Sequence, residues 1–255
     1  MNMGLTRYHM THPNIEVIAQ FYNDEFLAPF FMRHYSFADK IRCIIDLDTT
    51  DHTENIVSQY SNATLEYFKF PNLYEDELLT GNLNKAYAES EADWVIVVSP
   101  DEFVFIGDAN HYFANQECDV IPVRFFQVYR NIDDDDLDPI VPVQLLRRYG
   151  DPDVVKGQNK HGTKPIVAKT GKKIKWMPGG HGVWNPHRFT FSPNKLIGAH
   201  WHMADPCFCI HRRLERQVRM SSSDIAKGHG SHNVGNTEQS LLDECNEHLY
   251  DKQVF

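Results

Sequence analysis

Acidic residues follow three apolar segments that have the character of buried strands. The acids of YNDE (22–25) come after IEVIAQF, those of DLDTTD (46–51) after IRCII, and those of SPDE (99–102) after DWVIVV. Because the carboxyl ends of parallel strands meet at one edge of a sheet, these acids are expected to converge there. Such a group repels itself unless a cation or a ligand rich in hydrogen-bond donors offsets its charge.

The ligand that suits this edge is a divalent cation bound to phosphate. Oxygen ligands favour Mg²⁺ or Mn²⁺, and these ions commonly bridge a carboxylate and the phosphates of a substrate. A nucleoside diphosphate is the natural anion for such a site. The sequence has no G-x-G-x-x-G after the first strand and no G-x-x-x-x-G-K-[ST], so neither the dinucleotide fingerprint nor the P-loop accounts for phosphate binding.

Histidine is frequent, with 14 in the chain, and three histidines are candidates for a role at this edge. His200 ends the short apolar segment LIGAH, where a strand can hold its side chain rigidly. His202 lies two residues further on and points in the same direction along a strand. His181 lies in the glycine-rich segment GGHGVW. H-x-H also occurs in zinc sites, but neither H-E-x-x-H nor a set of cysteine partners accompanies it here.

Structural roles compete with chemical ones for several of these acids. Asp48 and Asp51 fit turn and helix-cap positions, and Asp101, which follows Ser-Pro, fits a cap as well. The run Asp133 to Asp136 is expected to be a solvated loop, because consecutive acids point in different directions. The basic run at 169–176 fits a solvated hairpin.

Strands and helices are predicted to alternate through residue 105. The apolar strands are continuous runs, which indicates a parallel sheet covered on both faces. The predicted strands lie at 15–22, 41–48, 63–70 and 93–99, and the predicted helices at 25–37, 54–61 and 74–90. Beyond residue 105 a long strand is expected at 119–130, antiparallel strands with turns at 164–169 and 173–184, and helices at 209–226 and 237–251.

The composition is that of a globular protein with a single mixed α/β domain. The chain has 255 residues, of which 42% are hydrophobic and 12% aromatic, enough for a sizeable core. Its net charge of -10 argues against a protein that grips a nucleic acid backbone. We expect one domain over 1–255, with a nucleotide-binding half at 14–105, a second half at 106–212 and C-terminal helices at 213–255.

The cysteines and the apolar segments bear on the compartment. The five cysteines form no C-x-x-C pair and have scattered spacing, which favours a reducing compartment over a disulfide framework. The first residues lack an apolar signal segment, and no stretch has the length of a membrane span. The expectation is a cytoplasmic protein with no transmembrane segment.

Four stretches, taken in order, resemble the family 2-like glycosyltransferases of GT-A fold, in the group with a DxDEF-type motif. IAQFYNDEFLAPFFMRHY is similar to the opening strand and helix of that group, and IIDLDTTDHTENIVSQY to its D-N-x-S-T-D-x-T turn. ADWVIVVSPDEFVF is similar to its W-x-x-x-x-D-x-D-E-F strand, and LIGAHWHMAD to its late H-Y segment. The resemblance covers about residues 14–212. It departs from the family at Ser99, where the first acid of D-x-D is expected.

The resemblance implies a GT-A fold, in which a Rossmann-like, mostly parallel sheet precedes an antiparallel acceptor-side portion. It implies a metal-dependent hexosyltransferase that moves a sugar from a nucleotide-sugar donor to a glycan or another hydroxyl acceptor. The metal, Mn²⁺ or Mg²⁺, would be held by Asp101, His200 and His202. The nucleotide would be bound by Tyr22, Asn23, Asp46, Asp48 and Asp51, with Asp51 reaching the base.

Transfer with inversion would also need a general base near the acceptor hydroxyl. The candidates for this base are Glu102, Asp205 and His181. Two other functions stay open: a nucleotidyltransferase of the same architecture, in which Asp101 would still hold the metal, and a catalytically silent nucleotide- or carbohydrate-binding protein. The absence of a basic, glycine-rich loop after the first strand weighs against the former, whereas Ser99 favours the latter.

Overall fold

The computed structural model describes residues 12–151, 162–229, 234–250 and 253. The strands are β1 (Ile15–Phe21), β2 (Lys40–Asp46), β3 (Ala63–Phe68), β4 (Trp94–Val97), β5 (Glu102–Phe105), β6 (Val120–Tyr129), β7 (Gly150–Asp151), β8 (Thr163–Lys169) and β9 (Leu196–Met203). The α-helices are α1 (Ala28–His34), α2 (Thr53–Val57), α3 (Asp76–Ala88), α4 (Ala109–Ala114), α5 (Val143–Leu146), α6 (Pro206–Arg219), α7 (Ser222–Lys227) and α8 (Glu238–Glu247).

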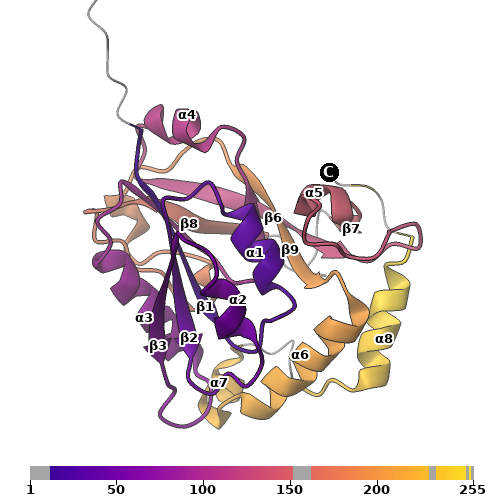
Figure 1. The fold of residues 1–255 in the computed structure, drawn as a ribbon. Helices are drawn as coiled ribbons and strands as arrows, with labels where there is room; N and C mark the ends of the chain where they lie inside the picture. The colour runs from indigo at the N-terminus through magenta and orange to yellow at the C-terminus, as the bar shows by residue number, and fades with distance from the viewer. Residues whose placement is uncertain (1–11, 152–161, 230–233, 251–252, 254–255) are drawn as a thin grey trace, which may run out of the picture.

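All of these strands belong to one sheet, in the order β3-β2-β1-β4-β8-β6-β9-β5, with β7 paired to β6 (Figure 1). β1 pairs in parallel with β2 and β4, and β2 pairs in parallel with β3. β8 is antiparallel to β4 and β6, and β5 is antiparallel to β9. The predicted α/β class, with a Rossmann-like parallel half followed by a largely antiparallel portion, is confirmed.

Both faces of the parallel half are covered, as its continuous apolar strands predict. Val17 of β1 belongs to the core cluster that also contains Phe31 of α1. Its neighbour Ile18 belongs to a second cluster with Tyr87 of α3, because successive side chains of a strand point to opposite faces. Figure 1 shows α1 and α2 on one side of these strands and α3 on the other.

Two predicted elements differ from the structure. The segment 173–184 has the predicted turn, at Pro178–Gly180, where Gly179 and Gly180 take a left-handed conformation (φ 72° and 69°). It does not have the predicted strands, since a single isolated antiparallel bridge joins Trp176 to Val183. The predicted helix at 209–226 is two helices. α6 ends at Arg219, since Met220 is extended (ψ 133°), and α7 begins after Ser221, whose side chain caps it.

β9 carries His200 between β5 and β6, and the glycine at position 198 lets it pack closely against both strands. A Cβ built on Gly198 would lie 2.6 Å from the ring of Phe125 and 2.8 Å from the carbonyl oxygen of Phe103. A side chain would therefore push the neighbouring strands apart. The glycine of LIGAH thus fixes the strand that positions His200.

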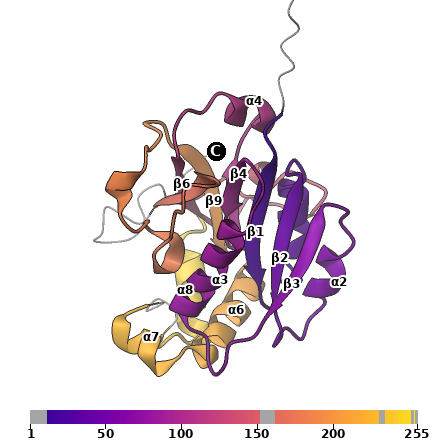
Figure 2. The ribbon, with the colours of Figure 1, turned by 90° about the vertical axis from the view of Figure 1, so that its left-hand side faces the viewer.

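α6 runs across the carboxyl ends of the parallel strands, which lie at the bottom of Figure 1. Asp205 caps its first turn by accepting a hydrogen bond from the backbone N–H of Phe208 (2.9 Å), and Pro206 occupies a first-turn position where its missing N–H costs nothing. α8 packs beside α6 through the ion pair of Arg213 with Glu244 (2.8 Å; Figure 2). No helix in the described ranges is long and apolar enough to span a membrane.

Candidate functional site

Three buried carboxylates lie where β1, β2 and β4 end. Asp24 follows β1, Asp46 ends β2 and Asp101 follows β4, and their exposed fractions are 1%, 0% and 1%. Since β2 and β4 flank β1 on opposite sides, the order of the strands reverses between β1 and β4. Ligands of open α/β sheets bind in the crevice at such a reversal. Asp24 and Asp101 lie on the two sides of this point.

Arginines of α6 supply the positive charge at this edge. Arg212 donates from Nε to Asp24 Oδ1 (3.0 Å) and from Nη1 to Asp101 Oδ2, so one guanidinium bridges two carboxylates. Arg219 pairs with Asp46 (Nη2 to Oδ2, 2.7 Å). Residues three, four and seven positions apart share one face of a helix, which is why a single helix reaches all three acids.

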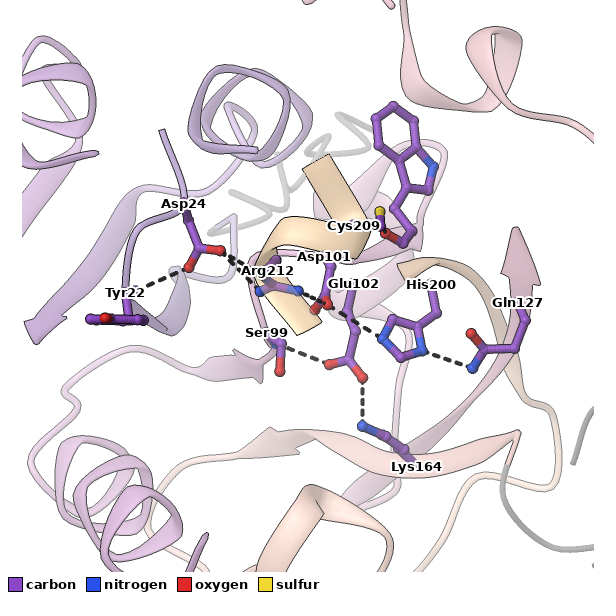
Figure 3. Close-up of polar contacts among 11 residues, drawn as sticks. Tyr22, Asp24, Ser99, Asp101, Glu102, Gln127, Lys164, His200, Cys209 and Arg212 are labelled. Carbon is purple, nitrogen blue, oxygen red and sulfur yellow. Dashed lines mark hydrogen bonds and ion pairs between the residues drawn. The ribbon is translucent and has the colours of Figure 1, made fainter. Parts of the chain in front are cut away.

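Asp101 is the centre of a continuous chain of polar contacts, which Figure 3 shows from Tyr22 to Gln127. His200 Nε2 lies 3.5 Å from Asp101 Oδ2, and the Gln127 amide lies 2.8 Å from His200 Nδ1. Burial raises the pKa of Asp101, but Arg212 and His200 outweigh it and hold that pKa well below its usual range. Asp101 is therefore a carboxylate that its neighbours already stabilise in the ionised form.

The turn after β1 gives Asp24 its position. Asn23 adopts a left-handed conformation (φ 46°), which asparagine tolerates better than most residues. Asp24 Oδ2 then accepts a hydrogen bond from the N–H of Tyr22 (3.0 Å), while its own N–H donates to Thr53 Oγ1 (2.8 Å). Burial raises the pKa of Asp24, and Arg212 opposes that shift.

Two of the expected nucleotide-binding residues contact Glu215 of α6. Tyr22 Oη and Asn23 Nδ2 both donate to Glu215 Oε1, at 2.9 and 2.6 Å. The guanidinium carbon of Arg219 lies 3.5 Å from the centre of the Tyr22 ring. Burial and the bond to Glu215 raise the pKa of Tyr22 to about 12. α6 therefore covers these side chains and, through Arg219, Asp46 as well.

The remaining expected nucleotide-binding residues, Asp48 and Asp51, make contacts that stabilise the turn after β2. Asp51 accepts hydrogen bonds from the N–H groups of Thr53 and Glu25, both at 2.9 Å, which is the turn role that its position also predicted, while the N-cap of α2 is His52. Asp48 is half exposed and pairs with Lys69 at 3.2 Å. It also donates its N–H to Asp46 Oδ1 (3.0 Å), so the turn holds Asp46 in place.

Of the three candidate bases, the structure places Glu102 next to Asp101 and gives the other two different surroundings. The Glu102 carboxylate accepts from Lys164 Nζ (2.5 Å) and from the N–H of Ser99 (3.0 Å). Asp205 is the cap of α6, and His181 is exposed after the turn at Pro178–Gly180. His202 lies on β9, but its side chain is outside the described part of the chain.

The residues around Asp101 do not fit a divalent cation in this arrangement. Asp101 Oδ2 is bonded to Arg212, and Oδ1 is enclosed by protein with no polar partner among the described residues. Ser99 supplies no carboxylate, and the neighbouring Glu102 is bonded to Lys164. Within the described ranges, no group of three histidine, cysteine or acidic side chains could hold a metal ion.

The sequence motifs missed the charged partners of the site, namely Lys164 of β8 and the face of α6 that carries Arg212, Glu215 and Arg219. A signal was present in RRLERQVR, where the charged residues recur at the three- and four-residue spacing of one helical face. That spacing identifies a charged face. It does not say which acids the face meets.

A cavity of about 500 Å³ lies apart from these residues. It is lined by side chains of α1, β5 and the segment 139–143, including Phe30, His34, Phe105 and Val141. None of the residues discussed above as nucleotide, metal or base candidates lines it. The carboxylate edge, and not this cavity, is therefore the candidate site.

No family model and no curated protein matches this sequence. Among solved structures it is similar to S. aureus TarS (TM-score 0.44, 14% identity), with 92% of this chain and 43% of TarS covered. It is also similar to TarS 1–349 in complex with UDP-GlcNAc (TM-score 0.43, 14% identity), with 92% of this chain and 71% of that chain covered. A third similar structure is glucosyl-3-phosphoglycerate synthase from Mycobacterium tuberculosis in complex with Mn²⁺, UDP and phosphoglyceric acid (TM-score 0.32, 17% identity), with 45% of this chain and 43% of that chain covered. The chain spans less than half the length of the TarS chain, and similarity at this level assigns no role to any residue.

Proposed function

We propose that this protein is a glycosyltransferase that moves a sugar from a nucleotide-sugar donor to a hydroxyl acceptor. The observation that carries the proposal is the meeting of Asp24, Asp101 and Arg212 at the point where the strand order reverses. Ligands of open α/β sheets bind at that point. The motifs of the sequence give the same location to the nucleotide and its diphosphate.

In the proposed reaction, the acceptor oxygen bonds to the anomeric carbon of the sugar. The bond from that carbon to the diphosphate breaks, and the diphosphate leaves with the electron pair. We assign Glu102 as the general base that accepts the proton of the acceptor hydroxyl, in a transfer that inverts the anomeric centre. Lys164 and the N–H of Ser99 fix the orientation of the Glu102 carboxylate, which supports this role.

We assign the nucleoside to the turns that carry Tyr22, Asn23, Asp46, Asp48 and Asp51. For Tyr22, Asn23 and Asp46, this role requires the nucleotide to replace contacts that they make with Glu215 and Arg219. Donor binding is then coupled to the position of α6. We also propose that residues 1–255 work as one domain, since strands from both halves of the chain form one sheet.

The experiment is a screen of nucleotide sugars that includes UDP-GlcNAc, UDP-glucose and GDP-, CDP- and ADP-sugars. A transferase of this kind is expected to be stabilised against heat by its donor and to release the nucleoside diphosphate slowly by hydrolysis. If no nucleotide sugar stabilises the protein or is hydrolysed, the proposal is wrong. Donor binding with no turnover would instead indicate a catalytically silent binding protein, and release of pyrophosphate from a nucleoside triphosphate would indicate a nucleotidyltransferase.

Replacing Glu102 by glutamine tests the base. We expect kcat to fall about 10²- to 10⁴-fold, because a glutamine cannot accept the proton, while the Kd of the donor changes little. Glu117→Gln, at an exposed position outside the site, is the matched control. Unchanged kcat in Glu102→Gln would remove Glu102 from the mechanism without affecting the donor assignment.

A further inference from the structure

Arg216 is a partly buried cation with no direct partner among the described residues. It lies on the same face of α6 as Arg212 and Arg219, four residues from the former and three from the latter. Those two arginines are bonded to carboxylates, whereas Arg216 makes no hydrogen bond or ion pair within the described part of the chain. Its charge is therefore available to a ligand.

The surroundings of Arg216 favour an incoming anion. Burial lowers the pKa of Arg216, and the like charge of Arg212 lowers it further, while Asp101 and Asp24 raise it. Asp24 and Asp101 both bond Arg212, and neither bonds Arg216. A negatively charged group beside Arg216 would offset the repulsion between the arginines, which is strong where water is excluded.

The same surroundings disfavour the binding of a divalent cation to Asp101. To bind Asp101, it would have to displace Arg212 from Oδ2, because Oδ1 is enclosed by protein. Breaking that buried pair is costly, and the displaced guanidinium would remain next to the ion, since Asp24 also holds it. The position of the family's first acid holds Ser99, which adds no negative charge to compensate.

We propose that Arg216 binds the diphosphate of the donor, and that the arginine face of α6 takes the charge-offsetting role of a divalent cation. The site then binds a nucleoside diphosphate without metal. Guanidinium groups suit this role because their planar donors match phosphate oxygens and their charge does not depend on pH. This inference rests on the proposed function, since it names how the same site holds its donor.

The test is calorimetric binding of UDP, GDP, CDP and ADP to the full chain, each in EDTA and in Mn²⁺, with the parent nucleosides as uncharged probes. We expect the diphosphate that binds best to have a Kd in EDTA within about threefold of that in Mn²⁺. Arg216→Ala should raise this Kd about 10- to 100-fold, the value of a hydrogen bond to a charged group, and should leave nucleoside binding unchanged. Arg216→Lys should retain more affinity than Arg216→Ala, because it keeps the charge.

Arg188→Ala is the matched control, since it removes an exposed arginine away from α6. Removing Arg216, which has no direct partner, should not lower the Tm of the unliganded protein, so a loss of binding can be separated from a loss of fold. Binding that requires Mn²⁺ would overturn the inference and leave the proposed function standing. Equal weakening of nucleoside and diphosphate would also overturn it, because Arg216 would then act on the fold. If no diphosphate binds in either condition, the proposed function fails and the inference with it.

Discussion

Replacing Arg212 by methionine would leave Asp24 and Asp101 buried without the guanidinium that bridges them. Arg212 is 6% exposed and both carboxylates are 1% exposed, so solvent cannot replace the lost charge. Breaking a buried ion pair in this way costs about 3–5 kcal/mol. For a chain of this size, each kcal/mol corresponds to roughly 2–4 °C, so we expect the Tm to fall by about 6–20 °C.

The loss should depend on pH in a defined direction. In the wild type, the pKa of Asp101 is held well below its usual range, so the stability that this carboxylate contributes is present from pH 8 to pH 5 and is lost only in stronger acid. Without Arg212, burial is opposed less strongly, because only His200 and Arg216 still lower the pKa of Asp101, and only Arg216 and the N–H of Tyr22 that of Asp24, so both pKa values rise. The folded variant then binds protons at these two carboxylates that the unfolded chain does not, so the stability that it loses relative to the wild type becomes smaller as the pH falls from 8 to 5.

Urea denaturation at pH 8 and pH 5, followed by tryptophan fluorescence, measures both effects. Arg212→Met combined with Asp24→Asn and Asp101→Asn is the rescue variant, since replacing all partners of a buried ionic group costs much less than removing one. We expect it to recover a large part of the loss at pH 8. A loss in Arg212→Met below about 1 kcal/mol, or an equal loss at both pH values, would refute the role given to Arg212.

Three further predictions concern a buried histidine of α1, the cap of α6 and the glycine of β9. Burial lowers the pKa of His34 to about 4, so the unfolded chain binds a proton between about pH 6.5 and pH 4 that the native state excludes. Stability should therefore fall by up to about 3 kcal/mol as the pH drops through this window, and His34→Gln should remove most of that slope in urea denaturation. Asp205→Ala should cost about 1 kcal/mol in the same assay through loss of the α6 cap, whereas Asp205→Asn, which keeps a capping oxygen, should cost little. Gly198→Ala should cost about 1–3 kcal/mol because its Cβ meets two neighbouring strands, whereas Gly107→Ala, with nothing within 4 Å, should be tolerated.

The parallel half of the fold could be predicted because its signal is local. A strand such as IEVIAQF is buried on both faces, so every position is under the same selection for apolar character and the run is continuous. The acids that follow β1, β2 and β4 were visible for the same reason, since a change from apolar to acidic residues marks the end of a buried strand. At 173–184 the turn was predicted correctly but the strands were not, because the chain on the two sides of Gly179 and Gly180 pairs through only one bridge.

The partners of these acids could not be predicted, because they come from distant parts of the chain. Arg212 is 188 residues from Asp24 and 111 from Asp101, and Arg219 is 173 residues from Asp46. Nothing in the local sequence of an aspartate distinguishes one that awaits a metal from one that a distant arginine neutralises. Only the placement of α6 across the strand ends decides between the two.

Ser99 and Arg212 both make the surroundings of Asp101 less negative. A serine at position 99 removes one negative charge from the D-x-D pattern, and Arg212 adds one positive charge next to the acid that remains, Asp101. Each of these features lowers the electrostatic attraction of the site for a divalent cation. On the proposed function, the charge still to be balanced is that of the diphosphate, and Arg216 is the cation on this face of α6 that no described carboxylate bonds directly.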